Sequence, residues 1–123
     1  MRSTQTSDLG ALNNWFQARG WPGISERHMQ MKGFIVDDVA AGFLMQTDAG
    51  VAYLENYISN PDARPKQVAT AIDQITAALL GLARAKGFEY VAAFTALPSI
   101  EKRAQRLGMS LHDEPYALLT KEL

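Results

Sequence analysis

Residues 51–83, VAYLENYISNPDARPKQVATAIDQITAALLGLA, hold the pattern that decides the fold. Apolar residues fall on both faces of the first part, which is typical of a strand covered on two sides, so we place this strand in the middle of a sheet. After the polar turn at Pro61 the apolar spacing changes to three and four residues. The apolar stripe consists of Val68, Ile72, Ile75, Leu79 and Leu82. The stretch therefore predicts a buried strand, a polar turn and a long amphipathic helix that begins near Gln67.

The junction between this strand and this helix is the candidate anion site. The first turn of a helix leaves backbone N–H groups unpaired and carries partial positive charge. Arg64 and Lys66 lie just before that helix, and a cation beside free amides helps to hold a phosphate or a diphosphate. The sequence leaves one alternative open, in which both residues are ordinary solvated loop cations.

Composition limits the class of protein. The 123 residues fit one domain, 1–123, with a core of its own. Hydrophobic residues make up 47% of the chain and charged residues 20%, which excludes a disordered protein. No apolar run approaches the eighteen or so residues that a membrane-spanning helix needs.

Charge and residue usage further limit the expected location, metal sites and partners of the protein. The first ten residues lack the apolar core of a signal peptide, so we expect a cytoplasmic protein. The absence of cysteine excludes disulfides and thiolate metal sites, and two separated histidines argue against a histidine metal site. The formal net charge of −1 argues against nucleic acid as the main partner.

The rest of the chain predicts a mixed α/β fold. The expected elements are a short strand at 4–6, a helix capped by Ser7 and ending at Gly20, a single turn capped by Ser25, strands at 33–36, 39–47 and 90–94, a polar helix at 100–107 and a final hairpin of 109–111 with 116–120. Gly42 inside a strand indicates either a bulge or a close crossing by a neighbouring side chain. The sheet would combine an antiparallel meander with one parallel βαβ unit, with helices on both faces.

This order of elements resembles the GNAT superfamily of acetyl-CoA-dependent N-acyltransferases over nearly the whole chain. RPKQVA at 64–69 lies where the family has its Q/R-x-x-G-x-G/A pyrophosphate loop, and QRLGM at 105–109 is similar to the family's E-K-x-G-F ending of the last helix. The resemblance implies that the loop amides take the diphosphate of coenzyme A and that the splayed end of the preceding strand pairs with its pantetheine arm. The cofactor-binding residues it implies are Tyr57, Ile58, Ser59, Arg64, Pro65, Lys66, Gln67, Val68, Ala69 and Thr70.

The chain departs from the family pattern at three positions. Gln67 replaces the first loop glycine and adds a side chain where the backbone should approach the phosphates. Ala104 stands where many members carry the tyrosine that protonates the leaving thiolate, and Leu97 stands where an asparagine is frequent. The candidates to replace the tyrosine are Tyr116, Tyr57, Ser99 and a water molecule.

Acetyl transfer needs few protein groups. The protein must align an amine with a thioester, polarise the carbonyl with an N–H near Ile58 and accept a proton from the ammonium. Glu55 is the candidate base because it is a carboxylate in an otherwise apolar strand, flanked on its own face by Tyr53 and Tyr57. A paired structural carboxylate is the alternative for Glu55. Glu26 and His28, in the loop after the first helix, are weaker candidates.

The expected function is transfer of an acetyl group from acetyl-CoA to a primary amine of a small molecule or peptide. One alternative is a catalytically inactive GNAT-like domain that binds a ligand or another protein. Another is an unrelated mixed α/β domain whose junction binds some other phosphate. A homodimer is a further expectation, because many small domains with an apolar terminal hairpin pair symmetrically.

Overall fold

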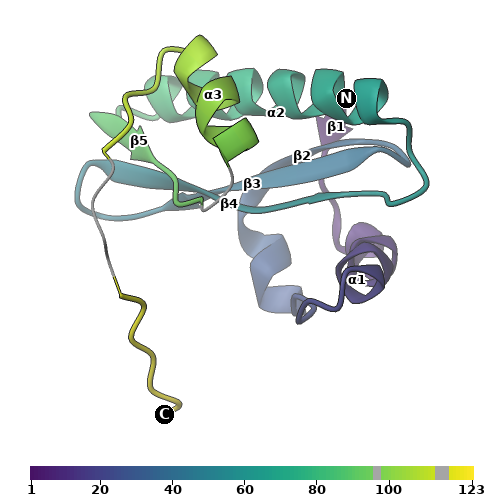
Figure 1. The fold of residues 1–123 in the computed structure, drawn as a ribbon. Coiled ribbons are helices and arrows are strands. Elements are labelled where there is room, and N and C mark those ends of the chain that lie inside the picture. The colour runs from purple at the N-terminus through teal and green to yellow at the C-terminus, as the bar shows by residue number, and fades with distance from the viewer. Residues whose placement is uncertain (96–97, 113–116) are drawn as a thin grey trace.

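The computed structural model describes residues 1–95, 98–112 and 117–123. The described strands form one sheet of five in the order β1-β2-β3-β4-β5, with helices on both faces (Figure 1). The strands are β1 (Arg2–Ser3), β2 (Lys32–Val36), β3 (Ala40–Gln46), β4 (Val51–Ser59) and β5 (Tyr90–Ala92). The helices are η1 (Thr6–Asp8), α1 (Leu9–Ala18), η2 (Glu26–Gln30), α2 (Pro65–Ala85) and α3 (Pro98–Arg106). Neighbours from β1 to β4 are antiparallel and β4 runs parallel to β5, which confirms the predicted mixed sheet.

Each face of the sheet has its own core. On one face, Leu12 and Phe16 of α1 pack with Phe43 and Ile58 of the sheet. On the other face, α2 buries Ile75 and Leu79 of the predicted stripe, whereas Val68, Ile72 and Leu82 are only partly buried. The buried residues of α2 are Ala71, Ile75, Thr76, Leu79 and Ala83. The helix begins two residues earlier than predicted, at Pro65, because the fixed φ of proline suits the first helical position.

The helix α2 also has the length and mean hydropathy of a membrane-spanning segment, as judged by composition alone. Its apolar residues have another explanation in this fold, since Ile75 and Leu79 are completely buried against the sheet. The buried face of this 21-residue helix therefore accounts for part of its apolar content.

The N-terminal strand and its cap differ from prediction. The strand is Arg2–Ser3 rather than residues 4–6, and it pairs with β2. Ser7 lies inside η1 and does not cap α1; the buried Asp8 takes that position and accepts the Gln5 backbone N–H at 2.7 Å. Arg2 donates to the carboxylates of both Asp8 and Asp37, so side chains of three segments fix the first strand.

The C-terminal hairpin and the position of β4 in the sheet also differ from prediction. Residues 109–112 and 117–123 form no strand, and residues 113–116 lie outside the described part of the chain. Leu118 and Leu119 are each 89% exposed, so they contribute no burial that would hold a strand against the sheet. Because no strand is added beyond β5, the middle strand of the described sheet is β3 and not β4.

Gly42 lies at a β-bulge and is also covered closely by a neighbouring side chain, so both predictions for this residue are confirmed. The register between β3 and β4 shifts at Gly42, so Asn56 and Tyr57 of β4 lie opposite this one residue, and Asn56 has a φ of 53°. The Tyr57 ring covers Gly42 so closely that a Cβ there would lie 2.7 Å from Tyr57 Cε1. The bulge also resets the alternation of β4, so that Leu54 and Tyr57 pack on the α2 side while Ile58 packs on the α1 side.

We expect Gly42→Val to lower the free energy of unfolding by about 1–3 kcal/mol, because the new side chain must displace the Tyr57 ring, which lies between β3 and α2. The Tyr57 hydroxyl is hydrogen-bonded to Thr76 on α2, so the ring cannot move away freely. Urea denaturation measures the effect. Gly81→Ala is the matched control, because a Cβ at this exposed position of α2 meets nothing within 4 Å, and it should leave stability unchanged or raise it. Equal stability of Gly42→Val and the wild type would contradict the close packing of Tyr57 on β3.

The Arg2–Asp8 contact predicts a pH dependence of stability. Hydrogen bonds from the Arg2 guanidinium lower the pKa of Asp8, against the effect of burial. Because this pKa is lower in the folded chain, Asp8 stabilises the fold above its unfolded pKa of about 3.9, and the stabilisation is lost as the pH falls through the folded-state pKa. Asp8→Asn should lower the midpoint of urea unfolding at neutral pH and flatten its decline in acid. The exposed Asp48→Asn is the control, and an equally flat profile for that variant would refute the assignment to Asp8.

Candidate functional site

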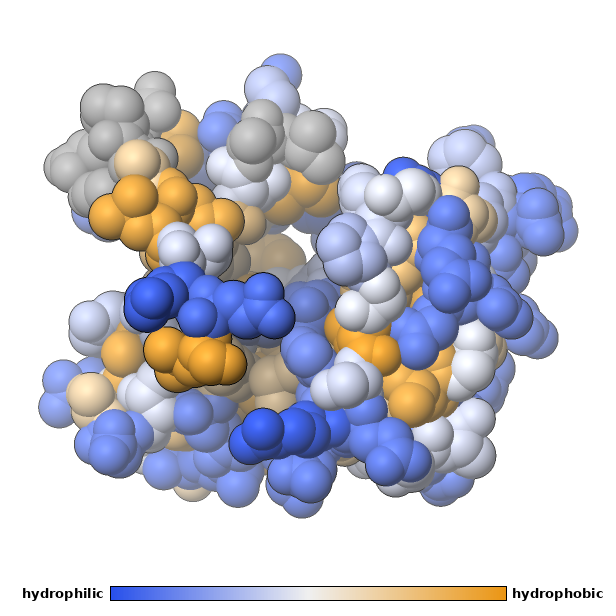
Figure 2. All heavy atoms as spheres, turned by 90° about the horizontal axis from the view of Figure 1, so that it is seen from below, coloured by the Kyte–Doolittle hydropathy of each residue, from blue (hydrophilic) through white to orange (hydrophobic). Residues whose placement is uncertain are grey.

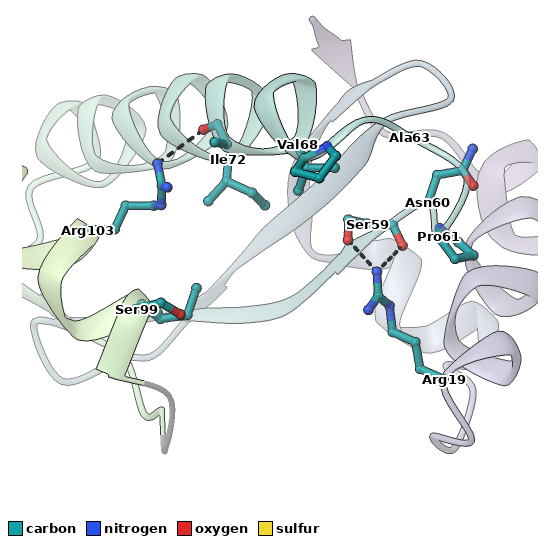
Figure 3. A pocket seen from close by; sticks show the side chains of 12 residues that line it. Arg19, Ser59, Asn60, Pro61, Ala63, Val68, Ile72, Ser99 and Arg103 are labelled. Carbon is teal, nitrogen blue, oxygen red and sulfur yellow. Dashed lines mark hydrogen bonds between the residues drawn. The ribbon is translucent and has the colours of Figure 1, made fainter.

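A cleft of about 340 Å³ opens where the end of β4, the start of α2 and α3 meet (Figure 3). Its α2 wall is one stripe of the first two turns, formed by Pro65, Val68, Ala69 and Ile72. The remaining lining residues come from the β4–α2 junction, from α3 and from the end of α1; they are Ser59, Asn60, Pro61, Ala63, Ser99, Ile100, Arg103 and Arg19. The site therefore combines segments that are far apart in the sequence.

The bulge in β4 lies between the part of that strand that pairs with β5 and the end that borders the cleft. The parallel pairing of β4 with β5 ends at Tyr53 and Ala92, whereas β4 continues to Ser59. Within the described residues, this last part of β4 has no strand on its β5 side. A free strand edge of this kind can pair with an extended ligand through backbone hydrogen bonds.

The start of α2 faces the same region. The first hydrogen bond of the helix runs from the Val68 N–H to the Arg64 carbonyl at 3.0 Å. The amides of Lys66 and Gln67 precede that bond, and Pro65 has no N–H. The N-terminus of the helix therefore offers two amides and a partial positive charge to an anion.

The predicted loop residues separate onto two flanks of α2. Pro65, Val68 and Ala69 line the cleft together with Ser59. In contrast, Lys66, Gln67 and Thr70 line a separate depression on the side of Val36 and Val39, near the β2–β3 turn. The Gln67 side chain turns back to accept the Arg64 backbone N–H at 3.3 Å. The residue that replaces the family glycine therefore directs its side chain away from the cleft.

The other predicted cofactor residues do not line the cleft. Arg64 is exposed at the N-cap of α2, and Ile58 is buried in the α1-side core. The Tyr57 hydroxyl lies 2.8 Å from Thr76 Oγ1, and burial raises the pKa of Tyr57 to about 12. The prediction that Tyr57 shares a face with Glu55 is wrong, because the bulge turns Tyr57 toward α2.

Glu55 is half-buried and lies opposite Phe43 on β3, on the α1 side of the sheet. Its strand neighbour Tyr53 stacks on Phe94, with ring centroids 6.1 Å apart. Figure 2 views the molecule from this side and shows a deep hollow beside the helices there. Tyr116, the other predicted catalytic residue, lies outside the described residues, as does Leu97.

The remaining residues of interest lie on α3 or in the segment between α1 and β2. Ala104 is half-buried on α3, and Ser99 lines the cleft. Ser25 occupies the N-cap position of η2, as predicted, and its backbone N–H donates to His28 Nδ1 at 3.1 Å. Trp21 is 50% exposed and its ring makes a tilted contact with the Phe16 ring.

Sequence reasoning missed both arginines of the cleft. Arg19 Nη2 donates to the Ser59 carbonyl at 3.1 Å and to its hydroxyl at 2.6 Å (Figure 3). Arg103 Nη1 lies 3.0 Å from both carboxylate oxygens of Asp73 and donates to the Ala69 carbonyl at 3.4 Å. These contacts join residues 30 to 40 positions apart, so no local pattern in the sequence announces them.

No family model matches the sequence, and no curated protein matches it. Solved structures do match. The glucosamine-6-phosphate N-acetyltransferase of Arabidopsis thaliana superposes with a TM-score of 0.68 at 10% identity, covering 98% of this chain and 97% of that one. An acetyltransferase of Trypanosoma brucei gives 0.66 at 18% identity, covering 97% of each chain.

A third solved structure is the aminoglycoside N-acetyltransferase AAC(6')-Iy in complex with CoA, which gives a TM-score of 0.63 at 18% identity, with 99% of this chain and 98% of that one covered. Identities this low establish the arrangement of the backbone and not the activity. The similarity nevertheless extends over nearly the full length of each of the three structures. The chain therefore folds as a GNAT-like domain.

Proposed function

We propose that this chain is an N-acetyltransferase that moves an acetyl group from acetyl-CoA to a primary amine of a small molecule or peptide. The observation that supports this most is the cleft at the end of β4, where an unpaired strand edge leads to the free amides of α2. The pantetheine arm would pair with the strand edge and the diphosphate would lie at the helix start. Solved structures of the same fold include N-acetyltransferases, one of them in complex with CoA.

The reaction joins the amine nitrogen to the acetyl carbon and breaks the bond from that carbon to the cofactor sulfur. The protein's main contribution is to hold the neutral amine and the thioester in contact. A base must remove one proton from the ammonium before the attack, and the second proton that the nitrogen loses as the amide forms balances the proton that the leaving thiolate takes up. Glu55 is the proposed base, because it lies on β4 immediately before the bulge and on the hollowed face of the sheet.

Ala104 supports a second candidate, a domain that binds the cofactor without transferring the acetyl group. A methyl group at this position of α3 supplies no proton for the thiolate. Tyr57 is a poor replacement, because its hydroxyl faces Thr76 on the other side of the sheet. A binding domain of this kind would show cofactor binding without release of free thiol.

Ala69→Glu tests the cofactor position. It places a carboxylate in the cleft, where it would repel the diphosphate, while Thr70→Glu places the same charge on the opposite flank of α2. For the wild type, acetyl-CoA at 100 times its Kd should add about 2.7 kcal/mol of stability. Thermal unfolding with and without acetyl-CoA should show this stabilisation in wild type and Thr70→Glu and not in Ala69→Glu.

The unliganded stability of both variants serves as the control for folding. Equal stabilisation of all three proteins would place the cofactor elsewhere on the molecule. Failure of acetyl-CoA to stabilise the wild type would contradict the proposed function itself.

Glu55→Gln tests the base. The variant should keep the stabilisation by acetyl-CoA but release thiol more slowly at neutral pH, on the order of 10²–10⁴-fold, which is the usual contribution of a positioned base. Thiol release with a panel of amines measures the rate. Glu89→Gln is the matched control, because Glu89 is an exposed carboxylate beside Gly50, at the opposite end of β4 from the cleft. A normal rate for Glu55→Gln would remove Glu55 from the mechanism.

A further inference from the structure

Arg19 carries a charge that no carboxylate neutralises within the part of the chain that the structure describes. Its hydrogen bonds go to the carbonyl and hydroxyl of Ser59, which are neutral acceptors, and both use the same terminal nitrogen, Nη2. Its third contact is with the Trp21 ring, whose centroid lies 5.7 Å from the guanidinium carbon. A guanidinium has five N–H donors, so these contacts fix the position of Arg19 and leave donors for a ligand.

The other cationic side chains of the region are placed differently. Arg103 also lines the cleft, but the carboxylate of Asp73 pairs with it at 3.0 Å. Arg64 and Lys66, the two cations that the sequence favoured, do not line the cleft. Among the described residues, Arg19 is therefore the cleft-lining cation that remains uncompensated by an acidic partner.

We propose that Arg19 is the side chain that binds the diphosphate of the CoA cofactor, a role that the sequence assigned to Arg64 and Lys66. This inference depends on the proposed function, since it names a ligand-contacting residue for that cofactor. Arg19 reaches the cleft from the end of α1 and lies against Ser59, the last residue of β4 (Figure 3).

The position of Arg19 along β4 selects the diphosphate over the other charged group of CoA. A pantetheine arm that pairs with the free edge of β4 reaches Ser59 at the end of the strand. The diphosphate is the first charged group after that arm. The 3′-phosphate of CoA is separated from the arm by the diphosphate and the ribose, so it lies further from Ser59.

The test measures the Kd of CoA and of dephospho-CoA, which lacks the 3′-phosphate, for wild type and Arg19→Met by calorimetry. The loss of a charge-assisted contact should raise both Kd values by the same factor, on the order of 10- to 100-fold. Arg27→Met, the same change at an exposed arginine of η2, is the matched control and should bind as wild type does. Arg19→Lys keeps the charge and should recover part of the affinity.

Ionic strength separates a direct contact from a structural role. If Arg19 contacts the phosphates, the difference between wild type and Arg19→Met should shrink as salt rises, because ions screen the attraction. A loss of affinity that does not depend on salt would mean that Arg19 only holds Ser59, and would overturn the proposal. Ser59→Ala removes the hydroxyl acceptor while keeping the charge, and should bind CoA more tightly than Arg19→Met does.

The remaining outcomes are also decisive. Equal Kd values for wild type and Arg19→Met would refute the role of Arg19 while leaving the proposed function intact. A loss confined to CoA, with dephospho-CoA unaffected, would assign Arg19 to the 3′-phosphate and overturn the diphosphate assignment. Absence of CoA binding to the wild type would refute the proposed function and the role of Arg19 together.

Discussion

The packing of Tyr57 against Gly42 is the contact on which the site depends. Two residues of β4 lie opposite one residue of β3 here, and only a residue without a side chain leaves room for the ring. The bulge lies between the part of β4 that pairs with β5 and the part that borders the cleft. It also turns Tyr57 toward α2, where the Thr76 hydroxyl satisfies the buried phenol. One close contact thus sets both the course of the strand and the orientation of its side chains.

The helical period of α2 determines which of its residues line the cleft. Pro65, Val68, Ala69 and Ile72 recur at intervals of three and four, so they form one side of the helix. Lys66 and Gln67 lie on a different flank, although they are adjacent to them in the chain. The cleft wall of α2 is consequently small and apolar. Charge for an anion must come from backbone amides and from side chains that other elements supply.

The sequence predicted the backbone of this protein better than its site. The meander, the crossover helix and the parallel strand follow from periodicity and turn residues, and all are present. The prediction of a C-terminal hairpin was wrong for residues 109–112 and 117–123. Alternation of apolar residues alone does not tell whether Leu118 and Leu119 have a surface to pack on. The contact of Arg19 with Ser59 joins positions 40 residues apart, and such a contact exists only once the chain is folded.

The replacement of a loop glycine by Gln67 shows how a departure from a family pattern should be interpreted. From the sequence, Gln67 adds a side chain at the place where the backbone should approach the phosphates. In the folded chain the side chain accepts the Arg64 N–H and lies on the flank away from the cleft, so it helps to begin the helix. Because a residue in the first helical turn can direct its side chain outward, the backbone amides stay accessible without glycine. Gln67 is thus no argument against cofactor binding at the β4–α2 junction. Whether the chain transfers an acetyl group depends instead on which group supplies a proton to the leaving thiolate.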